Sequence, residues 1–249
     1  MEAGAWIGQG YEVAQYQLHE AVFRGRSPVV VSRFTKRWRE RGYLLVERWN
    51  RVGMNRLRLT SKGRDFLLLH AAADSEELFV PSRSVAPKDL SHRLWINDLR
   101  VVLGRLPAKP KLVLPCWAIE RRFVPRLPAI PDVLAVTQGG SSSAVLGIEV
   151  DLGGEALRSV FVPKLGVLQS VLRDLSKGEA CAILVLTSTE RRRDAIAAAT
   201  SDLDGSIPIA IETLPREGGR NGLQALERMF NPSVNATSQP ADEKAQCFS

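Results

Sequence analysis

The chain has 249 residues, of which 45% are apolar and 24% charged, and its formal net charge is +7. This composition predicts a globular protein of one or two domains and excludes a disordered chain. No apolar run approaches the roughly 18 residues of a membrane span, and the first ten residues lack the pattern of a secretory signal, so we expect a cytoplasmic protein without membrane contact.

Positive charge is concentrated in residues 24–64, which hold 13 Lys or Arg and two acidic residues, a net charge of +11. Residues 1–23 carry three acidic residues and no Lys or Arg. A concentrated basic block is typical of a polyanion-binding face, and an arginine-rich helix in contact with solvent is the alternative.

The basic block begins with helices. An apolar stripe predicts a helix over residues 11–23, and a second helix is expected from Ser27-Pro28 to about Arg41, because serine caps and proline fits the first turn. Val30, Val31, Phe34 and Trp38 would form its apolar face. The opposite face and its flank would be polar and cationic, as a helix in the DNA major groove requires. These candidate DNA contacts are Ser32, Arg33, Lys36, Arg37 and Arg39.

A β-hairpin is predicted next. Residues 43–49 and 56–59 have strand patterns, residues 50–53 supply a turn, and a new helix begins near Thr60. Arginines along this hairpin are further candidates for contacts to DNA phosphates. They are Arg48, Arg51, Arg56 and Arg58.

This order of elements resembles a winged helix-turn-helix domain. Such domains have a further helix at the start, and Met1–Gln9 is too short to supply it well. We therefore expect a trimmed domain, one completed by a partner, or a true start that lies upstream. A winged helix that contacts protein rather than DNA remains the alternative.

The domain organisation follows from the Pro- and Ser-rich residues 74–89, which are expected to link a domain at 1–73 to one at 90–230. The second domain has an α/β pattern, and residues 231–249 are expected to be a disordered tail. The helices of the second domain are predicted at 90–103, 162–175, 190–199 and 222–230. Its strands are predicted at 111–118, 131–136, 144–151, 181–187 and 207–213. The short connection at 138–143 predicts antiparallel pairing of the strands on either side.

Acidic residues lie at the ends of two of these strands. Asp132 opens one strand, and Glu149 and Asp151 close the next on a shared face. If the strands are neighbours, the three carboxylates converge at one edge of the sheet. Carboxylate clusters hold Mg²⁺, which can activate water for phosphodiester cleavage.

The segments Pro131-Asp132 and Gly147-Ile-Glu-Val-Asp151, with the helix that follows, resemble the PD-(D/E)XK nuclease fold. With His92-Arg-Leu, Asn97-Asp-Leu-Arg and the winged helix, the chain resembles the replication-relaxation family of plasmid and mobile-element proteins. The resemblance implies that Asp132 and Glu149 ligate Mg²⁺ or Mn²⁺, helped by the carbonyl of Val150. The motif's usual lysine is replaced by Asp151, and Lys164 on the next helix is the candidate substitute in a catalytic set of Asp132, Glu149, Asp151 and Lys164. His92 is interpreted as a polar residue of its helix, with phosphate binding as the alternative.

Two functions remain open at this point. The first is a metal-dependent DNA-nicking protein of plasmid replication or mobilisation. The second is a catalytically inactive origin-binding protein or transcriptional regulator. Double-stranded DNA is the expected partner of both, with a second copy of the chain or a mobilisation or replication protein as a further partner. The three tyrosines all lie before residue 44, which excludes a tyrosine-linked nicking mechanism in the second domain.

Overall fold

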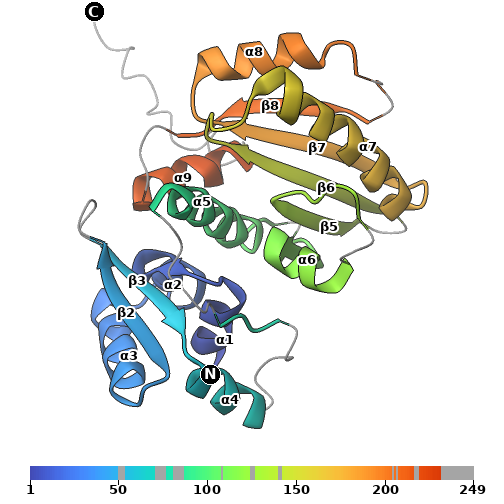
Figure 1. Ribbon diagram of the computed structural model, residues 1–249. Coiled ribbons are helices and arrows are strands. Elements are labelled where there is room, and N and C mark those ends of the chain that lie inside the picture. Colours follow the sequence, from blue (N-terminus) through green and yellow to red (C-terminus); the bar gives the residue numbers. More distant parts are fainter. Residues whose placement is uncertain are drawn as a thin grey trace, which may run out of the picture.

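The computed structural model describes residues 1–49, 54–70, 77–80, 87–107, 109–123, 127–139, 142–203, 205, 207–215 and 219–230. Over these residues the chain is a mixed α/β protein with two β-sheets (Figure 1). Residues 1–80, the N-terminal unit, and residues 87–230, the C-terminal unit, each have a large hydrophobic core. The predicted hairpin turn at 50–53, residues 74–76 and 81–86 of the predicted linker and the tail at 231–249 lie outside the described residues.

The N-terminal unit combines helices with a small antiparallel sheet in the order β1-β3-β2. Side-chain caps fix two helix starts where the sequence predicts them: Ser27 accepts from the Val29 amide, and Thr60 accepts from the Gly63 amide. Each cap satisfies a backbone donor that the helix itself leaves free. The elements are α1 (Glu2–Gln9), β1 (Val13–Ala14), α2 (Gln15–Val22), α3 (Pro28–Glu40), β2 (Leu44–Trp49), β3 (Met54–Leu59) and α4 (Ser61–Leu69).

The expectation that residues 1–9 cannot supply the first helix is wrong, because they form α1. Ile7 on this helix is fully buried. A Cβ on Gly4 would lie 2.1 Å from the Trp38 ring, so the missing side chain lets α1 approach α3 closely. The same small residues that weaken helix propensity are needed for this packing. The helix predicted to begin at residue 11 begins at Gln15, because Val13 and Ala14 pair with β3.

Two described parts of the predicted linker belong to the two units: residues 87–89 form the first turn of α5, and residues 77–80 are packed against the N-terminal unit. Leu78 is 1% exposed and belongs to that unit's core, and the Phe79 amide donates to the Gly8 carbonyl at 3.0 Å. Residues 77–80 therefore extend the N-terminal unit beyond the predicted boundary at residue 73.

The C-terminal unit is built on a mixed sheet in the order β4-β5-β6-β7-β8. β4, β5 and β6 are successively antiparallel, which confirms the pairing predicted across residues 138–143, while β7 and β8 run parallel to β6. The elements are α5 (Pro87–Leu103), β4 (Leu112–Pro115), α6 (Cys116–Phe123), β5 (Val133–Gly139), β6 (Ser142–Asp151), a π-helical turn η1 (Leu157–Phe161), α7 (Val162–Ser176), β7 (Ala180–Thr187), α8 (Glu190–Thr200), β8 (Ile209–Thr213) and α9 (Gly219–Phe230).

One predicted strand of this unit is too long. The strand expected at 111–118 ends at Pro115, and α6 begins at the next residue. Trp117, Ala118 and Ile119 are buried residues of α6 and not of a strand. A short apolar run in a sequence does not distinguish a buried strand from a buried helix.

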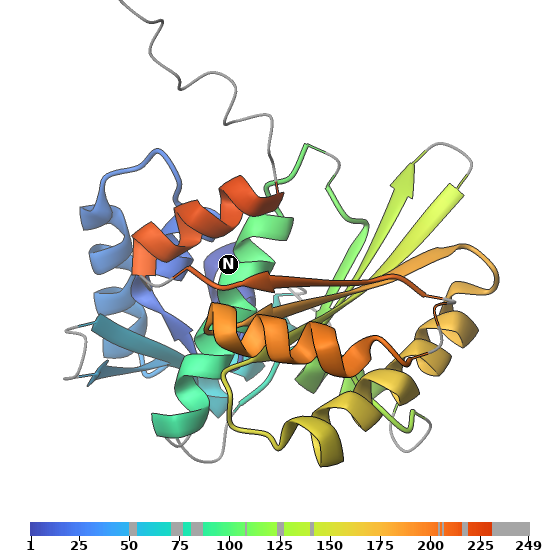
Figure 2. The ribbon, with the colours of Figure 1, turned by 90° about the horizontal axis from the view of Figure 1, so that it is seen from above.

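The five-stranded sheet lies between two helical layers (Figure 2). α7 and α8 pack against β6, β7 and β8, whereas α5 and α9 pack against each other on the other face. None of the helices in the described part of the chain is long and apolar enough to cross a membrane.

Helix α5 joins the two units through buried polar side chains. The Asn97 amide donates to the carbonyls of Gly10 and Glu12 at 3.1 and 3.0 Å. The Asp98 carboxylate accepts from the Tyr16 hydroxyl at 2.9 Å and from the Gln17 amide at 2.8 Å. Asn97 and Asp98 are 0% and 2% exposed. Because a buried polar group without a partner is costly, these bonds favour one placement of the units.

Burial of Asp98 also makes the stability of the protein depend on pH. Desolvation raises the pKa of Asp98 from 3.8 to about 7, against the lowering effect of the bonds from Gln17 and Tyr16. The folded protein therefore binds a proton that the unfolded chain releases between these two values, so that the free energy of unfolding falls as the pH rises through this window.

We predict that Asp98→Asn removes this dependence. The difference in free energy of unfolding between wild type and variant should fall by up to about 1.4 kcal/mol per pH unit between pH 5 and 7. Urea unfolding at three pH values measures it. Asp194→Asn, at an exposed residue of α8, is the control and should follow the wild type. A wild-type curve parallel to that of Asp98→Asn would contradict the prediction.

Candidate functional site

The β5–β6 hairpin brings two of the predicted acidic residues together. Val133 pairs with Ile148, and continuation of this register places Asp132 opposite Glu149. The Asp132 carboxylate accepts a bond from the Val150 amide at 2.8 Å, which ties it to β6. Both carboxylates are buried, with Asp132 7% and Glu149 1% exposed. We call His92, Asp132, Glu149 and Lys164 the acidic cluster.

Asp132 also contacts helix α5. His92 Nε2 lies 3.0 Å from Asp132 Oδ2. Burial lowers the pKa of His92, but the hydrogen bond and the charge of Asp132 outweigh it and raise that pKa above its ordinary value. The sequence-based interpretation of His92 as a simple polar residue of its helix therefore misses a direct contact with the cluster.

Glu149 faces the beginning of α7. Lys164 Nζ donates to Glu149 Oε2 at 2.6 Å, as expected for a lysine that substitutes from the next helix. Burial and then the charge of Asp132 raise the pKa of Glu149, although Lys164 opposes them. The other oxygen, Oε1, is buried and has no hydrogen-bond partner among the described residues. A buried acceptor of this kind is costly unless a ligand satisfies it.

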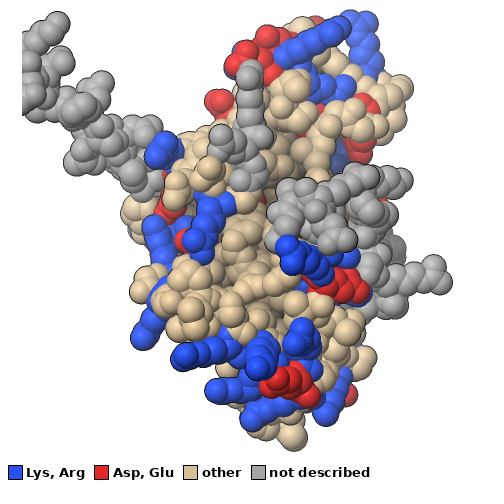
Figure 3. Space-filling model, turned by 90° about the vertical axis from the view of Figure 1, so that its left-hand side faces the viewer, with Lys and Arg blue, Asp and Glu red and all other residues tan. Residues whose placement is uncertain are grey.

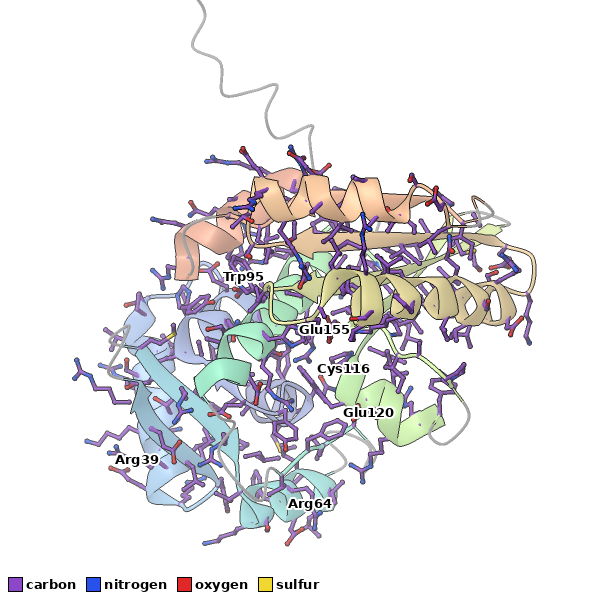
Figure 4. The ribbon with its side chains drawn as sticks, turned by 45° about the horizontal axis from the view of Figure 1, so that its top comes forward. Arg39, Arg64, Trp95, Cys116, Glu120 and Glu155 are labelled. Atoms are coloured by element: carbon purple, nitrogen blue, oxygen red, sulfur yellow. The ribbon has the colours of Figure 1, made fainter. Side chains whose placement is uncertain are left out.

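Asp151 does not join the cluster, although alternation places it on the face of Glu149. Its carboxylate accepts from Arg192 Nε at 2.6 Å and from the Gly153 amide at 2.9 Å. Arg192 also donates to the carbonyl of Glu155, in the loop after β6 (Figure 4). The predicted convergence of three carboxylates is therefore wrong, because an arginine from α8 holds the third. No group of three or more His, Cys, Asp or Glu within the described ranges is arranged to hold a metal ion.

Two partners of the acidic residues were missed by sequence reasoning. His92 lies 40 positions before Asp132, and Arg192 lies 41 positions after Asp151. No local motif connects residues at such separations. The helical periodicity of α5 and α8 places the two side chains toward the sheet only once the packing of the layers is known.

Helix α3 presents the second candidate surface. It buries Val31, Thr35 and Trp38. Val30, predicted for the apolar face, is 37% exposed, because the contact with the core follows a narrower stripe. The five predicted DNA contacts of this helix are all exposed, and Figure 4 shows Arg39 on the outer side of the N-terminal unit. They are Ser32, Arg33, Lys36, Arg37 and Arg39.

The hairpin arginines divide into two groups. Arg48 is exposed, whereas Arg56 bonds to Glu12 and Glu47 at 2.9 and 3.0 Å, and Arg58 bonds to Glu47 at 2.8 Å. The side chains of Arg56 and Arg58 are only 15% and 8% exposed. Their placement does not fit the predicted phosphate contacts, because Glu12 and Glu47 already hold the two guanidinium groups. Arg51 lies outside the described residues.

Lys and Arg side chains gather over the lower half of the face in Figure 3, which the N-terminal unit occupies, and continue to its middle. The acidic cluster and α3 therefore form two chemically different regions of one molecule.

Comparisons with protein-family models, curated proteins and solved structures gave no match.

We predict that Glu149 and Lys164 are strongly coupled in stability. Lys164→Met should destabilise by about 3 kcal/mol, because it leaves a buried carboxyl without its partner. The double variant Glu149→Gln/Lys164→Met should lose less than the sum of its single variants. Denaturant unfolding of all four proteins gives the coupling. The exposed pair Arg193 and Asp194 is the control cycle and should be nearly additive; additivity at Glu149 and Lys164 as well would refute the coupling.

Proposed function

We propose that this chain is a DNA-binding protein that acts in the cytoplasm in the replication or mobilisation of a plasmid or mobile element. In this proposal the N-terminal unit is a winged helix-turn-helix domain, with α2 and α3 as the paired helices and the β2–β3 hairpin as the wing. The observed helix α1 supplies the element that the resemblance requires and that the sequence alone did not predict. The replication-relaxation family remains the group that the chain resembles.

One observation carries this proposal: α3 has one buried apolar face and a continuous exposed face with four cationic side chains. A helix of this kind fits the major groove, where Arg and Lys bond to guanine and Ser bonds to several bases. The only charged partner found for this face in the described residues is Glu40, 3.9 Å from Lys36. An exposed pair at this distance contributes little, so the face stays available to phosphates.

The acidic cluster supports a second function, metal-dependent nicking of DNA. Two buried carboxylates and the unpartnered Glu149 Oε1 fit a hard cation, since Mg²⁺ is often held by one or two carboxylates and by substrate phosphates. Asp132 and Glu149 would hold Mg²⁺ or Mn²⁺, which supplies charge neutralisation to a phosphodiester. Lys164 would offer its remaining N–H donors to the same phosphate.

The inactive regulator is favoured by a different observation. Each carboxylate already has a basic partner: His92 for Asp132, Lys164 for Glu149 and Arg192 for Asp151. Ion pairs of this kind can stabilise the fold without any role in binding a metal ion or a substrate. A mobilisation or replication protein would then supply any chemistry at the DNA.

We predict that Lys36→Glu/Arg39→Glu weakens binding to duplexes of every sequence by at least about tenfold at 50 mM salt, because two attractive charges become repulsive. Arg191→Glu/Arg193→Glu on α8 is the matched control and should bind as the wild type does. Fluorescence anisotropy with a labelled duplex measures both. Wild-type affinity that does not change between about 50 and 200 mM salt would refute DNA binding through phosphates.

We predict that wild-type protein converts a supercoiled plasmid to the open circle in the presence of Mg²⁺ or Mn²⁺. Asp132→Asn and Glu149→Gln should abolish nicking, because each removes a carboxylate that would hold the ion, while leaving duplex binding intact. Asp194→Asn is the control and should retain nicking. Equal cleavage by the wild type and both cluster variants, or none by any, would leave the regulator as the function.

A further inference from the structure

A groove runs along the boundary between the two units, beside the beginning of α3. Its volume is about 310 Å³. Pro28 and Ser32 of α3, Met54 and Asn55 of β3 and residues of α2 line it from the N-terminal unit. Arg220, in the first turn of α9, lines it from the C-terminal unit. The predicted DNA-reading helix therefore shares a hollow with an arginine of the other unit.

The polar lining of this groove is already organised. Asn55 Nδ2 donates to Gln15 Oε1 at 2.8 Å, and Gln15 Nε2 donates to Ser32 Oγ at 3.3 Å. These bonds link β3, α2 and α3 through side chains that commonly contact the sugar–phosphate backbone of DNA. The groove consequently offers amide and hydroxyl groups beside a cation, which suits an anion with several acceptor oxygens.

Beside the groove, arginines outnumber the carboxylates that could neutralise them, because Arg105 already bonds to both carboxylates. Arg105 is 11% exposed and bonds to Glu20 at 2.7 Å and to Glu227 at 3.3 Å. Arg220 and Arg24 approach the same two carboxylates only at 3.7 and 3.4 Å, and their side chains are 49% and 60% exposed. Three arginines thus share two carboxylates, and the two exposed ones keep most of their charge available to solvent.

The packing of α9 fixes these charges relative to α3. α9 packs against α5, which holds the N-terminal unit through Asn97 and Asp98. Arg105 adds a bond to the Glu20 carbonyl of α2 at 2.6 Å. Because these contacts hold the two units in one placement, binding at both units costs less conformational entropy than it would with a mobile connection between them.

We propose that DNA held by α3 is also held by the C-terminal unit, with Arg220 of that unit binding a phosphate of the duplex at this groove and Arg24 of the N-terminal unit binding another beside α9. The inference rests on the proposed DNA binding and adds a second contact surface to it. The first residues of a helix-turn-helix recognition helix contact base edges, so the duplex backbone passes close to the beginning of α3. Arg220 lines the groove beside α3, and Arg24, four residues before α3 begins, contacts Glu227 of α9.

The test compares the salt dependence of DNA affinity. Arg24→Ala/Arg220→Ala should bind a labelled duplex about tenfold more weakly at 50 mM salt, and its slope of log affinity against log salt should be smaller by about one to two, since each lost phosphate contact removes about 0.9. Arg24→Lys/Arg220→Lys should restore most of the slope, because it keeps the charge. Arg191→Ala/Arg193→Ala, on the distant helix α8, is the matched control and should keep the wild-type slope.

The outcomes separate this inference from the function it rests on. If wild-type protein binds no duplex, DNA binding itself fails. If wild type binds and Lys36→Glu/Arg39→Glu does not, but Arg24→Ala/Arg220→Ala behaves as the α8 control does, the second surface is overturned and DNA binding stands. Circular dichroism melting establishes that each variant is folded. Arg220→Gln alone, at a half-exposed side chain, isolates the contact of the C-terminal unit and should also reduce the slope; an unchanged slope in this variant overturns the second surface.

Discussion

The contacts of α5 with the N-terminal unit set the geometry of the whole molecule. Asn97 and Asp98 both bond to groups of residues 10–17, and Asn97 Oδ1 also accepts from Arg100 of α5 at 2.8 Å. Separating the units would expose these groups to water, and a shifted docking would leave them buried and unpaired. A polar interface of this kind selects one orientation where an apolar interface would tolerate several.

Two of the arginines that the sequence suggests for DNA binding have a structural role instead. Arg56 and Arg58 belong to the most basic segment of the chain, yet both are held by glutamates, with Glu47 shared between them. Their role is to hold β3 to β2 through Glu47 and to the residue before β1 through Glu12. The charges left for a polyanion include those of α3, the exposed Arg48 and, by our inference, Arg24 and Arg220 beside α9.

The sequence predicts most elements of this fold because their signals are local. The caps at Ser27 and Thr60, the turn before β6 and the apolar runs of β6 and β7 all depend on neighbours within a few residues. Prediction from the sequence fails where an element depends on contacts with residues far away in the chain. α1 needs Trp38 to fill the space over Gly4, and β4 ends at Pro115 because α6 packs there instead.

The candidate site divides in the same way. Hairpin register brings Asp132 to Glu149, which strand spacing could predict. The contact of Lys164 with Glu149 was suggested by the resemblance to the nuclease fold. The partners His92 and Arg192 come from helices of different layers, and their contacts depend on how those layers pack. The ion pair of Asp151 with Arg192 could not be predicted either, because strand alternation determines which face a side chain lies on and not which residue it contacts.

The pairing of these carboxylates has a consequence for how a polyanion approaches the protein. Glu149 with Lys164 and Asp151 with Arg192 act at a distance as local dipoles rather than as negative charges. The potential of a dipole decays faster with distance than that of an isolated charge, so these acids would exert little long-range repulsion on a nucleic acid. The long-range field that guides an encounter then comes mainly from the basic block of residues 24–64, and it would turn the N-terminal unit toward the polyanion first.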